Sequence, residues 1–179
     1  MADPLSDGRQ SEAALCIARG VRRMFRARGF SSITELPLID GRRADVVAID
    51  REGAVLIVEI KSSVADFRAD KKWRDYIAQC DRLYFAICHE TPGDIFPADA
   101  GLIVADRFGA EIVREPERRV IAAATRKAML LRFALAAADR GRHDHSLHRR
   151  DMDLLLHLSA GPAHRPRVVD RRNPDDSRR

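Results

Sequence analysis

Several features that would assign this chain to a common functional class are scarce or missing. The 179 residues contain three cysteines, without CxxC spacing, which favours reduced thiols over a disulfide framework. No apolar run approaches the roughly 20 residues of a membrane span, and no glycine-rich loop that would cradle nucleotide phosphates is present. The first residues, MADPLSDGRQSE, lack the apolar segment of a signal peptide. We therefore expect a soluble, cytoplasmic protein.

Lysine is also scarce, with four lysines against 28 arginines in a chain of net charge +5. Three of the four are Lys61, Lys71 and Lys72. A lysine ammonium is a compact point charge, whereas arginine presents a planar fork of donors. The excess of basic side chains is compatible with a nucleic-acid partner and does not establish one.

Residues 42–63, RRADVVAIDREGAVLIVEIKSS, contain the most unusual combination of residues. Residues 44–50 and 54–61 are short, rich in β-branched side chains and almost continuously apolar, which predicts two central strands covered on both faces. Three charged residues interrupt this apolarity: Asp45, Glu59 and Lys61. A carboxylate inside a buried strand is costly unless it is paired or holds a cation.

The loop between these two strands decides whether the two carboxylates meet. If Arg51–Gly53 form a three-residue loop, Asp50 lies opposite Ala54 and Asp45 lies opposite Glu59. Directly opposed residues share a face of the sheet, with Cβ atoms roughly 5 Å apart. A two-residue Glu-Gly turn would shift the pairing by one and point Asp45 away from Glu59.

Lys61 follows Glu59 by two residues, so the two side chains lie on the same side of their strand. Two carboxylates and an ammonium on one face are suited to a Mg²⁺ site, with Mn²⁺ as a substitute, and to metal-assisted phosphodiester cleavage. The alternative is a structural patch in which Lys61 and Arg43 neutralise the two acids.

The rest of the chain predicts an α/β fold with the element order αβββαβ, followed by a hairpin and a closing helix. The expected elements are a helix over 11–29, strands over 33–39, 44–50 and 54–61, a helix over 65–80, a strand over 82–88, a hairpin over 101–114 and a helix over 119–140. A helix that connects two strands of one sheet gives a mixed sheet with helices on both faces. Around this domain, residues 11–140, we expect a flexible leader, 1–10, and a basic, largely disordered tail, 141–179, with a short helix over 152–158.

Four groups of side chains have a structural and a functional interpretation. Arginines along the first helix form a solvated face or contact phosphates: Arg19, Arg22, Arg23 and Arg26. An apolar stripe on the second helix is expected to face the core rather than to form a ligand-binding surface: Trp73, Tyr76, Ile77 and Cys80. Cations near the acidic residues are expected to contact DNA phosphates: Arg42, Arg43, Lys71 and Lys72. Histidines of the tail are a weaker candidate for a metal site, because the segment lacks the cysteines of a typical zinc site and is expected to be unstructured: His143, His145 and His148.

The Asp…Glu-x-Lys arrangement in an αβββαβ order resembles the PD-(D/E)XK nuclease superfamily. Within it, GRRADVVAID, IVEIKSS, ADFRADKKWRDYIAQCD, LYFAI and GLIVADRFGAEIVRE resemble the MmcB-related family of bacterial DNA repair proteins. The resemblance covers roughly residues 33–135. It implies a restriction-endonuclease-like fold and Mg²⁺-dependent phosphodiester hydrolysis, with Asp45 and Glu59 as metal ligands and Lys61 positioning or activating the attacking water. Ala44 replaces the proline of the motif.

The superfamily often adds an upstream glutamate, and two candidates compete for this role. We prefer Glu35, in the ELPL stretch beside the acidic strands, over Glu12, which is suited to the first turn of the first helix. The sequence thus predicts a metal-dependent DNA nuclease that acts in DNA repair, with DNA and other repair proteins as partners. The alternative is a repair protein that binds DNA or a partner with this fold and has no turnover.

Overall fold

The computed structural model describes residues 11–70 and 72–159, and the side chains of this part through residue 141. The elements follow the chain as α1 (Glu12–Ala27), β1 (Ser31–Pro37), β2 (Arg43–Ile49), β3 (Val55–Ile60), α2 (Val64–Ala69), the 3₁₀-helix η1 (Trp73–Gln79), β4 (Arg82–Ile87), the 3₁₀-helix η2 (Gly93–Ile95), β5 (Gly101–Ala105), β6 (Ala110–Arg114) and α3 (Ala123–Ser159). The contacts between residues divide the chain into two units, residues 1–139 and 140–179.

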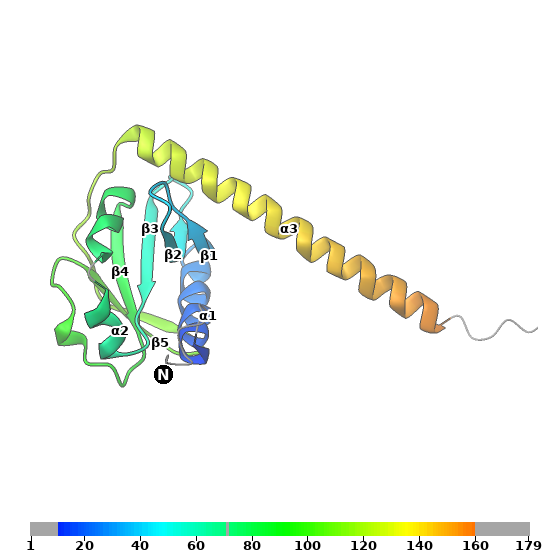
Figure 1. Cartoon of the computed structure of the whole chain (residues 1–179), viewed down its shortest axis with the longest axis horizontal. Coiled ribbons are helices and arrows are strands. Elements are labelled where there is room, and N and C mark those ends of the chain that lie inside the picture. The colour runs from blue at the N-terminus through cyan, green and yellow to red at the C-terminus, as the bar shows by residue number, and fades with distance from the viewer. Residues whose placement is uncertain (1–10, 71, 160–179) are drawn as a thin grey trace, which may run out of the picture. The chain divides into compact units, whose positions relative to one another are not determined.

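The strands form one six-stranded sheet in the order β1-β2-β3-β4-β5-β6. β3, β4 and β5 are parallel neighbours, and the other pairs are antiparallel. The crossover between β3 and β4 carries α2 and η1 (Figure 1). The predicted α/β class with a mixed central sheet flanked by helices is confirmed.

Two apolar layers cover the sheet. On one face, α1 packs Ile17, Val21 and Phe25 against alternate residues of β2, β3 and β4. On the other face, Trp73 of η1 and Met129 of α3 pack against the intervening residues of the same strands. Burial on both faces explains why β3 is apolar at five of its six positions and buried at all six.

The hairpin between β2 and β3 has the register that a three-residue loop predicts. Ile49 pairs with Val55 and Val46 with Val58, so continuing the register places Asp45 across from Glu59. The Asp50 carboxylate fixes the loop by accepting hydrogen bonds from the backbone N–H of Glu52 (2.9 Å) and of Ala54 (2.8 Å). Gly53 has φ +80°, a conformation that glycine adopts without strain.

Two helix predictions need correction. The helix expected over residues 65–80 is two short helices, because the backbone of Asp70 is extended. Asp70 Oδ1 accepts a hydrogen bond from the backbone N–H of Lys72 (2.9 Å), and aspartate that bonds nearby backbone in this way competes with helix. The predicted core stripe is nevertheless largely confirmed, since Trp73, Tyr76 and Cys80 are buried.

The last helix is longer than the sequence predicts, because α3 continues to Ser159. Its sequence contains no proline, and a single glycine inside a helix costs only about 1 kcal/mol, so the change of composition at Gly141 does not end it. The segment expected to be disordered, 161–179, and the expected leader, 1–10, lie outside the described residues. No helix in the described part of the chain is long and apolar enough to span a membrane.

Arg126 of α3 is bound to Asp81, the residue before β4. Its two terminal nitrogens contact the two carboxylate oxygens of Asp81 at 2.6 and 2.7 Å. Asp81 Oδ2 also accepts a hydrogen bond from the backbone N–H of Val55 (2.8 Å), and Arg126 donates to the carbonyl oxygen of Gly53 (2.8 Å). These bonds attach the start of α3 to the end of the sheet at which β3 and β4 begin.

Candidate active site

A cleft at the end of β3 collects most of the predicted catalytic side chains, and we call it the Asp45–Glu59 cleft. Its lining comes from α1, β2, β3, the start of α2 and η1. The lining residues are Ser11, Ala14, Arg43, Asp45, Glu59, Ile60, Lys61, Ser62, Asp66 and Tyr76. Of the predicted catalytic set, the cleft brings together Asp45, Glu59 and Lys61.

The two carboxylates of the cleft are in different environments. Asp45 Oδ2 accepts a hydrogen bond from the backbone N–H of Ile60 (2.8 Å). Glu59 is only 4% exposed, and its Oε1 has no hydrogen-bond partner among the described residues. Burial raises the pKa of Asp45 and raises that of Glu59 well above its usual range, and the nearby Asp45 charge raises the pKa of Glu59 further.

A divalent cation would relieve this arrangement. A buried carboxylate oxygen without a partner is costly, and hard cations such as Mg²⁺ prefer oxygen ligands. Asp45 and Glu59 therefore fit the predicted Mg²⁺ or Mn²⁺. The described residues contain no group of three His, Cys, Asp or Glu side chains arranged around one ion, so these two acids are the protein ligands that this geometry offers.

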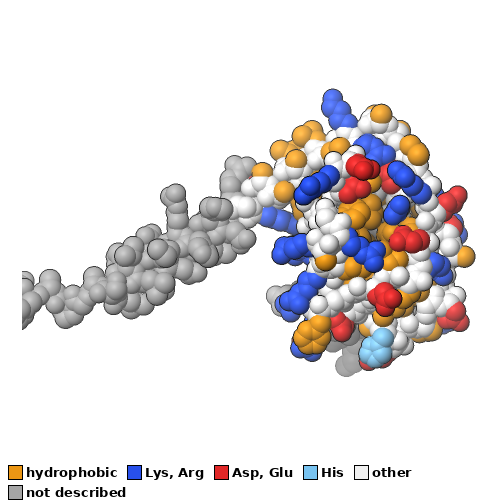
Figure 2. Space-filling model, turned by 180° about the vertical axis from the view of Figure 1, so that it is seen from behind, with side chains coloured by type: hydrophobic (Ala, Val, Ile, Leu, Met, Phe, Trp, Pro, Cys, Tyr) orange, Lys and Arg blue, Asp and Glu red, His pale blue; other side chains and the backbone are white. Residues whose placement is uncertain are grey.

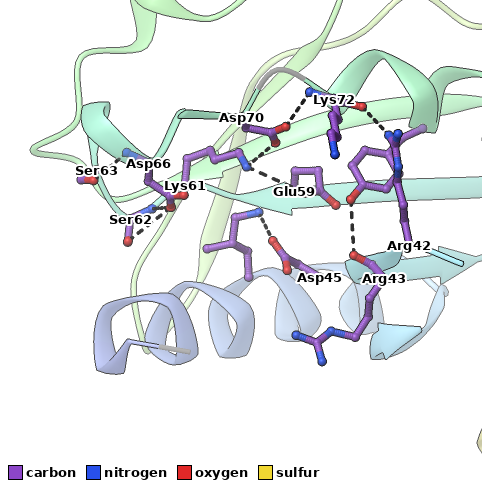
Figure 3. A network of polar contacts seen from close by, with 12 residues as sticks. Arg42, Arg43, Asp45, Glu59, Lys61, Ser62, Ser63, Asp66, Asp70 and Lys72 are labelled. Atoms are coloured by element: carbon purple, nitrogen blue, oxygen red, sulfur yellow. Dashed lines mark hydrogen bonds and ion pairs between the residues drawn. The ribbon is translucent and has the colours of Figure 1, made fainter. Parts of the chain in front are cut away.

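Lys61 is held beside Glu59 by a residue that sequence reasoning missed (Figure 3). The Lys61 Nζ lies 2.6 Å from Asp70 Oδ2 and 3.9 Å from Glu59 Oε2. Burial alone would lower the pKa of Lys61, but the hydrogen bond to Asp70 and the charge of Glu59 raise it above its ordinary value. The ammonium is thus fixed and protonated next to the carboxylate pair.

Asp66 and Tyr76 also line the cleft and were missed as site residues. Asp66 Oδ2 accepts a hydrogen bond from the backbone N–H of Ser62 (3.2 Å), and Ser63 caps the helix through the N–H of Asp66 (3.1 Å). The Tyr76 hydroxyl donates to the carbonyl oxygen of Arg43 (3.4 Å). Burial, with the charges of Glu59 and Asp45, raises the pKa of Tyr76, so the phenol stays protonated.

Glu35 lies near this cleft without lining it. Thr34 pairs with Val46 and Leu36 with Ala44, so Glu35 is opposite Asp45, and its charge contributes to the raised pKa of Asp45. Its carboxylate is ion-paired with Nε of Arg43. Glu35 has φ +54°. At this residue the alternation of side chains between the two faces of β1 is interrupted, since Ile33 and Leu36 are three residues apart and belong to the same core cluster.

Glu12 occupies the first turn of α1 and is exposed, whereas its neighbours Ser11 and Ala14 line the cleft. The choice between the two glutamates stays a prediction.

Glu35→Gln is expected to weaken Mn²⁺ binding several-fold, because it removes a negative charge beside Asp45. Glu12→Gln is expected to leave Mn²⁺ binding unchanged within about twofold. Mn²⁺ binding is measured by titration of both variants. The reverse ranking would move the site toward α1.

Glu59→Gln is expected to stabilise the metal-free protein at neutral pH, by on the order of 1 kcal/mol. Because the pKa values of Asp45 and Glu59 are raised, the folded state binds more protons than the unfolded state. The free energy of unfolding therefore falls as pH rises above the usual carboxyl range. This decrease with pH should be smaller in Glu59→Gln. Urea unfolding between pH 4.5 and 7.5 in EDTA measures it, and exposed Glu52→Gln is the control. Identical pH profiles for wild type and Glu59→Gln would contradict the raised pKa.

The cations that were predicted to contact DNA differ in their ion pairing and exposure. Arg42 is ion-paired with Asp75 and donates to the carbonyl oxygen of Lys72 (2.8 Å). Arg43 lines the cleft and is paired with Glu35. Lys72 is exposed. Lys71 and the side chains of His143, His145 and His148 lie outside the described residues, and the DNA contacts stay a prediction.

The fold and this cleft together define an α/β protein with a carboxylate pair and a buried lysine at the ends of two central strands. Comparison with known proteins gives the family: the chain belongs to the MmcB-like family, whose model, described as DNA repair protein MmcB-like, matches residues 1–146. The predicted family is confirmed.

Two solved structures resemble the chain. SPO1766, a protein of unknown function from Silicibacter pomeroyi, is 38% identical over 78% of this chain and 96% of its own, with a TM-score of 0.74. A repair endonuclease from Pyrococcus abyssi is 23% identical over 45% of this chain and 39% of its own, with a TM-score of 0.31, which is too low to support an argument. No curated protein matches the chain.

Proposed function

We propose that this protein is a metal-dependent DNA nuclease of the PD-(D/E)XK type that acts in DNA repair. The observation that carries the proposal is the buried, unpartnered Oε1 of Glu59, in a cleft shared with Asp45 and Lys61. A purely structural ion-paired patch would satisfy each buried oxygen, and here the nearest ammonium is bonded to Asp70 instead.

In this proposal, Asp45 and Glu59 hold Mg²⁺ or Mn²⁺. When bound, such an ion supplies charge neutralisation at the phosphate and acidifies water. Lys61 orients the attacking water and stabilises the negative charge that develops on the phosphate oxygens. Asp70 holds the Lys61 side chain in place, and the N-terminal residues of α1 form one wall of the cleft.

Cleavage of supercoiled, single-stranded and branched DNA with Mg²⁺ or Mn²⁺ tests the proposal. Wild type is expected to cleave at least one substrate in a metal-dependent reaction, and Asp45→Asn purified in parallel is expected to lose this activity, which excludes a contaminating nuclease. Exposed Asp94→Asn is the matched control. DNA binding without cleavage on any substrate would favour the non-catalytic alternative, a repair protein that binds DNA or a partner.

A second readout does not depend on turnover. Mn²⁺ is expected to raise the unfolding temperature of wild type and of Asp94→Asn, because an ion that binds only the folded state stabilises it. The same concentration should leave Asp45→Asn unchanged. Equal shifts in all three proteins would place the ion elsewhere.

A further inference from the structure

Four arginines of α1 lie outside the Asp45–Glu59 cleft and have no acidic partner in the described part of the chain: Arg19, Arg22, Arg23 and Arg26. We call them the arginine face. Their spacing of three and four residues places them on one side of the helix, all four are exposed, and together they line a hollow. Arg42 and Arg43 are instead neutralised by acids. The arginine face therefore carries positive charge that remains available to an external anion.

The turn between β5 and β6, residues 106–109, lies against the middle of α1. A Cβ on Gly20 would approach the carbonyl oxygens of Asp106 and Gly109 to 2.1 and 2.3 Å, so helix and turn touch through backbone. Arg23 of the arginine face donates to the carbonyl oxygen of Phe108 (3.4 Å). The turn is thus attached directly beside the arginine face.

This turn presents an aromatic ring to solvent. Phe108 is 72% exposed, although the turn is ordered by the Asp106 carboxylate, which accepts hydrogen bonds from the N–H of Phe108 (2.7 Å) and of Gly109 (2.9 Å). The Arg107 guanidinium lies over the ring, 5.6 Å from its centre. The exposed ring lies in an ordered turn that is bonded to Arg23 of the arginine face and has Arg107 over the ring, so this surface offers both stacking and positive charge.

Figure 2 shows Lys and Arg side chains along the left margin of the domain, which is the side of α1, because α1 lies at the right of the sheet in Figure 1 and Figure 2 is turned by 180°. A ligand that combines regularly spaced negative charge with flat aromatic groups fits such a surface. Single-stranded DNA has both: its phosphates pair with arginine, and its unpaired bases stack on aromatic side chains. Duplex DNA keeps its bases inside and would use only the charge.

We propose that the arginine face and Phe108 bind a single-stranded segment of DNA, with phosphates on the arginines and a base stacked on Phe108. This inference rests on the proposed function for the choice of DNA as the ligand. Helix α1 connects the Asp45–Glu59 cleft with the arginine face, since Ala14 lines the cleft and lies about 12 Å along the helix axis from Arg22. The preferred substrate of the cleft is then DNA with a single-stranded part.

The arginine arm of the test measures binding of a fluorescent single-stranded oligonucleotide to the full chain in EDTA, so that cleavage plays no part. Arg19→Ala, Arg22→Ala and Arg26→Ala combined should lower the affinity about tenfold or more. The slope of log affinity against log salt should flatten by about 2, at roughly 0.7 per lost phosphate contact. A control removes three exposed arginines elsewhere: Arg51→Ala, Arg118→Ala and Arg132→Ala. It should lower the affinity less than threefold.

The aromatic arm compares single-stranded with duplex DNA. Phe108→Ala should lower the affinity for the single strand about tenfold and that for duplex less than twofold, because only unpaired bases stack on the ring. Phe108→Trp should retain binding, since it keeps an aromatic face. Unfolding temperatures of all variants verify that the fold is intact.

Three results would overturn the inference. Equal losses from the two arginine triples would mean that total charge alone attracts DNA. An equal loss for single strand and duplex in Phe108→Ala would remove the stacking role. Binding to phosphatidylserine vesicles that depends on the arginine face, without binding to the oligonucleotide, would identify a membrane surface instead. A wild type that never cleaves but binds as expected would refute the nuclease proposal and leave this surface standing.

Discussion

Replacing Lys61 by methionine is expected to lower DNA cleavage by roughly 10²–10⁴-fold while DNA affinity changes only a few-fold. The ammonium lines the cleft, 2.6 Å from Asp70 and 3.9 Å from Glu59. In the proposed reaction it can therefore act on the attacking water and the phosphate, but it contributes little to binding the rest of the strand. Methionine keeps the length and apolar stem of the side chain, and Lys61→Ala serves as a second variant. Single-turnover cleavage and metal-free binding separate the two effects.

The control for Lys61 is Lys127→Met, which removes the same charge from an exposed lysine of α3. It should change cleavage less than tenfold. Normal cleavage by Lys61→Met would mean that the lysine only balances the charge of Glu59, and the nuclease proposal would lose its principal catalytic group.

Arg126→Ala is expected to destabilise the domain by about 3 kcal/mol, because it leaves the Asp81 carboxylate buried without its counter-ion. The Asp81 side chain is only 7% exposed and bonds both terminal nitrogens of Arg126. For a domain of this size the loss corresponds to a fall in unfolding temperature of roughly 10 °C. Calorimetry measures it, and exposed Arg132→Ala on the same helix is the control.

The pH dependence of this loss has a defined sign. Burial would raise the pKa of Asp81, but the hydrogen bonds from Arg126 and from the Val55 N–H lower it below its usual value. Its stabilisation is therefore present above the usual carboxyl range and is lost as pH falls through the lowered pKa. The difference between wild type and Arg126→Ala should be largest at neutral pH. A double change, Arg126→Leu with Asp81→Asn, should recover part of the stability, because it removes the unpaired charge and keeps an oxygen acceptor for the Val55 N–H. A loss for Arg126→Ala no larger than that for Arg132→Ala would refute the role of the pair.

The sequence predicts the two strands of the central hairpin but leaves its register open. A three-residue loop places Asp45 across from Glu59, whereas a two-residue Glu-Gly turn would separate them, and both are compatible with the turn residues. The structure has the first register, in which the Asp50 carboxylate binds the N–H groups of Glu52 and Ala54. The position of Lys61 on the same side as Glu59 follows from the period of two along one strand and was predictable without the register.

Residues that act through tertiary structure were not predictable in the same way. Asp70 reaches Lys61 only because the helix breaks at that residue, and periodicity predicts an unbroken helix there. The Asp81–Arg126 pair joins residues 45 positions apart, and nothing in either neighbourhood indicates the other. Tyr76 was expected in the core from its position in an aromatic stripe. It is buried, and it also lines the cleft.

The positive φ of Glu35 has a consequence for the conformational preferences of the chain. A non-glycine residue in the left-handed region costs roughly 1–2 kcal/mol, and Glu35 is the one described residue other than glycine with a positive φ. Glycine would relieve this cost but would also delete the carboxylate opposite Asp45. The chain thus has a disfavoured backbone conformation at the position of an acidic side chain next to the cleft. If only the stability of the fold mattered, glycine would be favoured at this position.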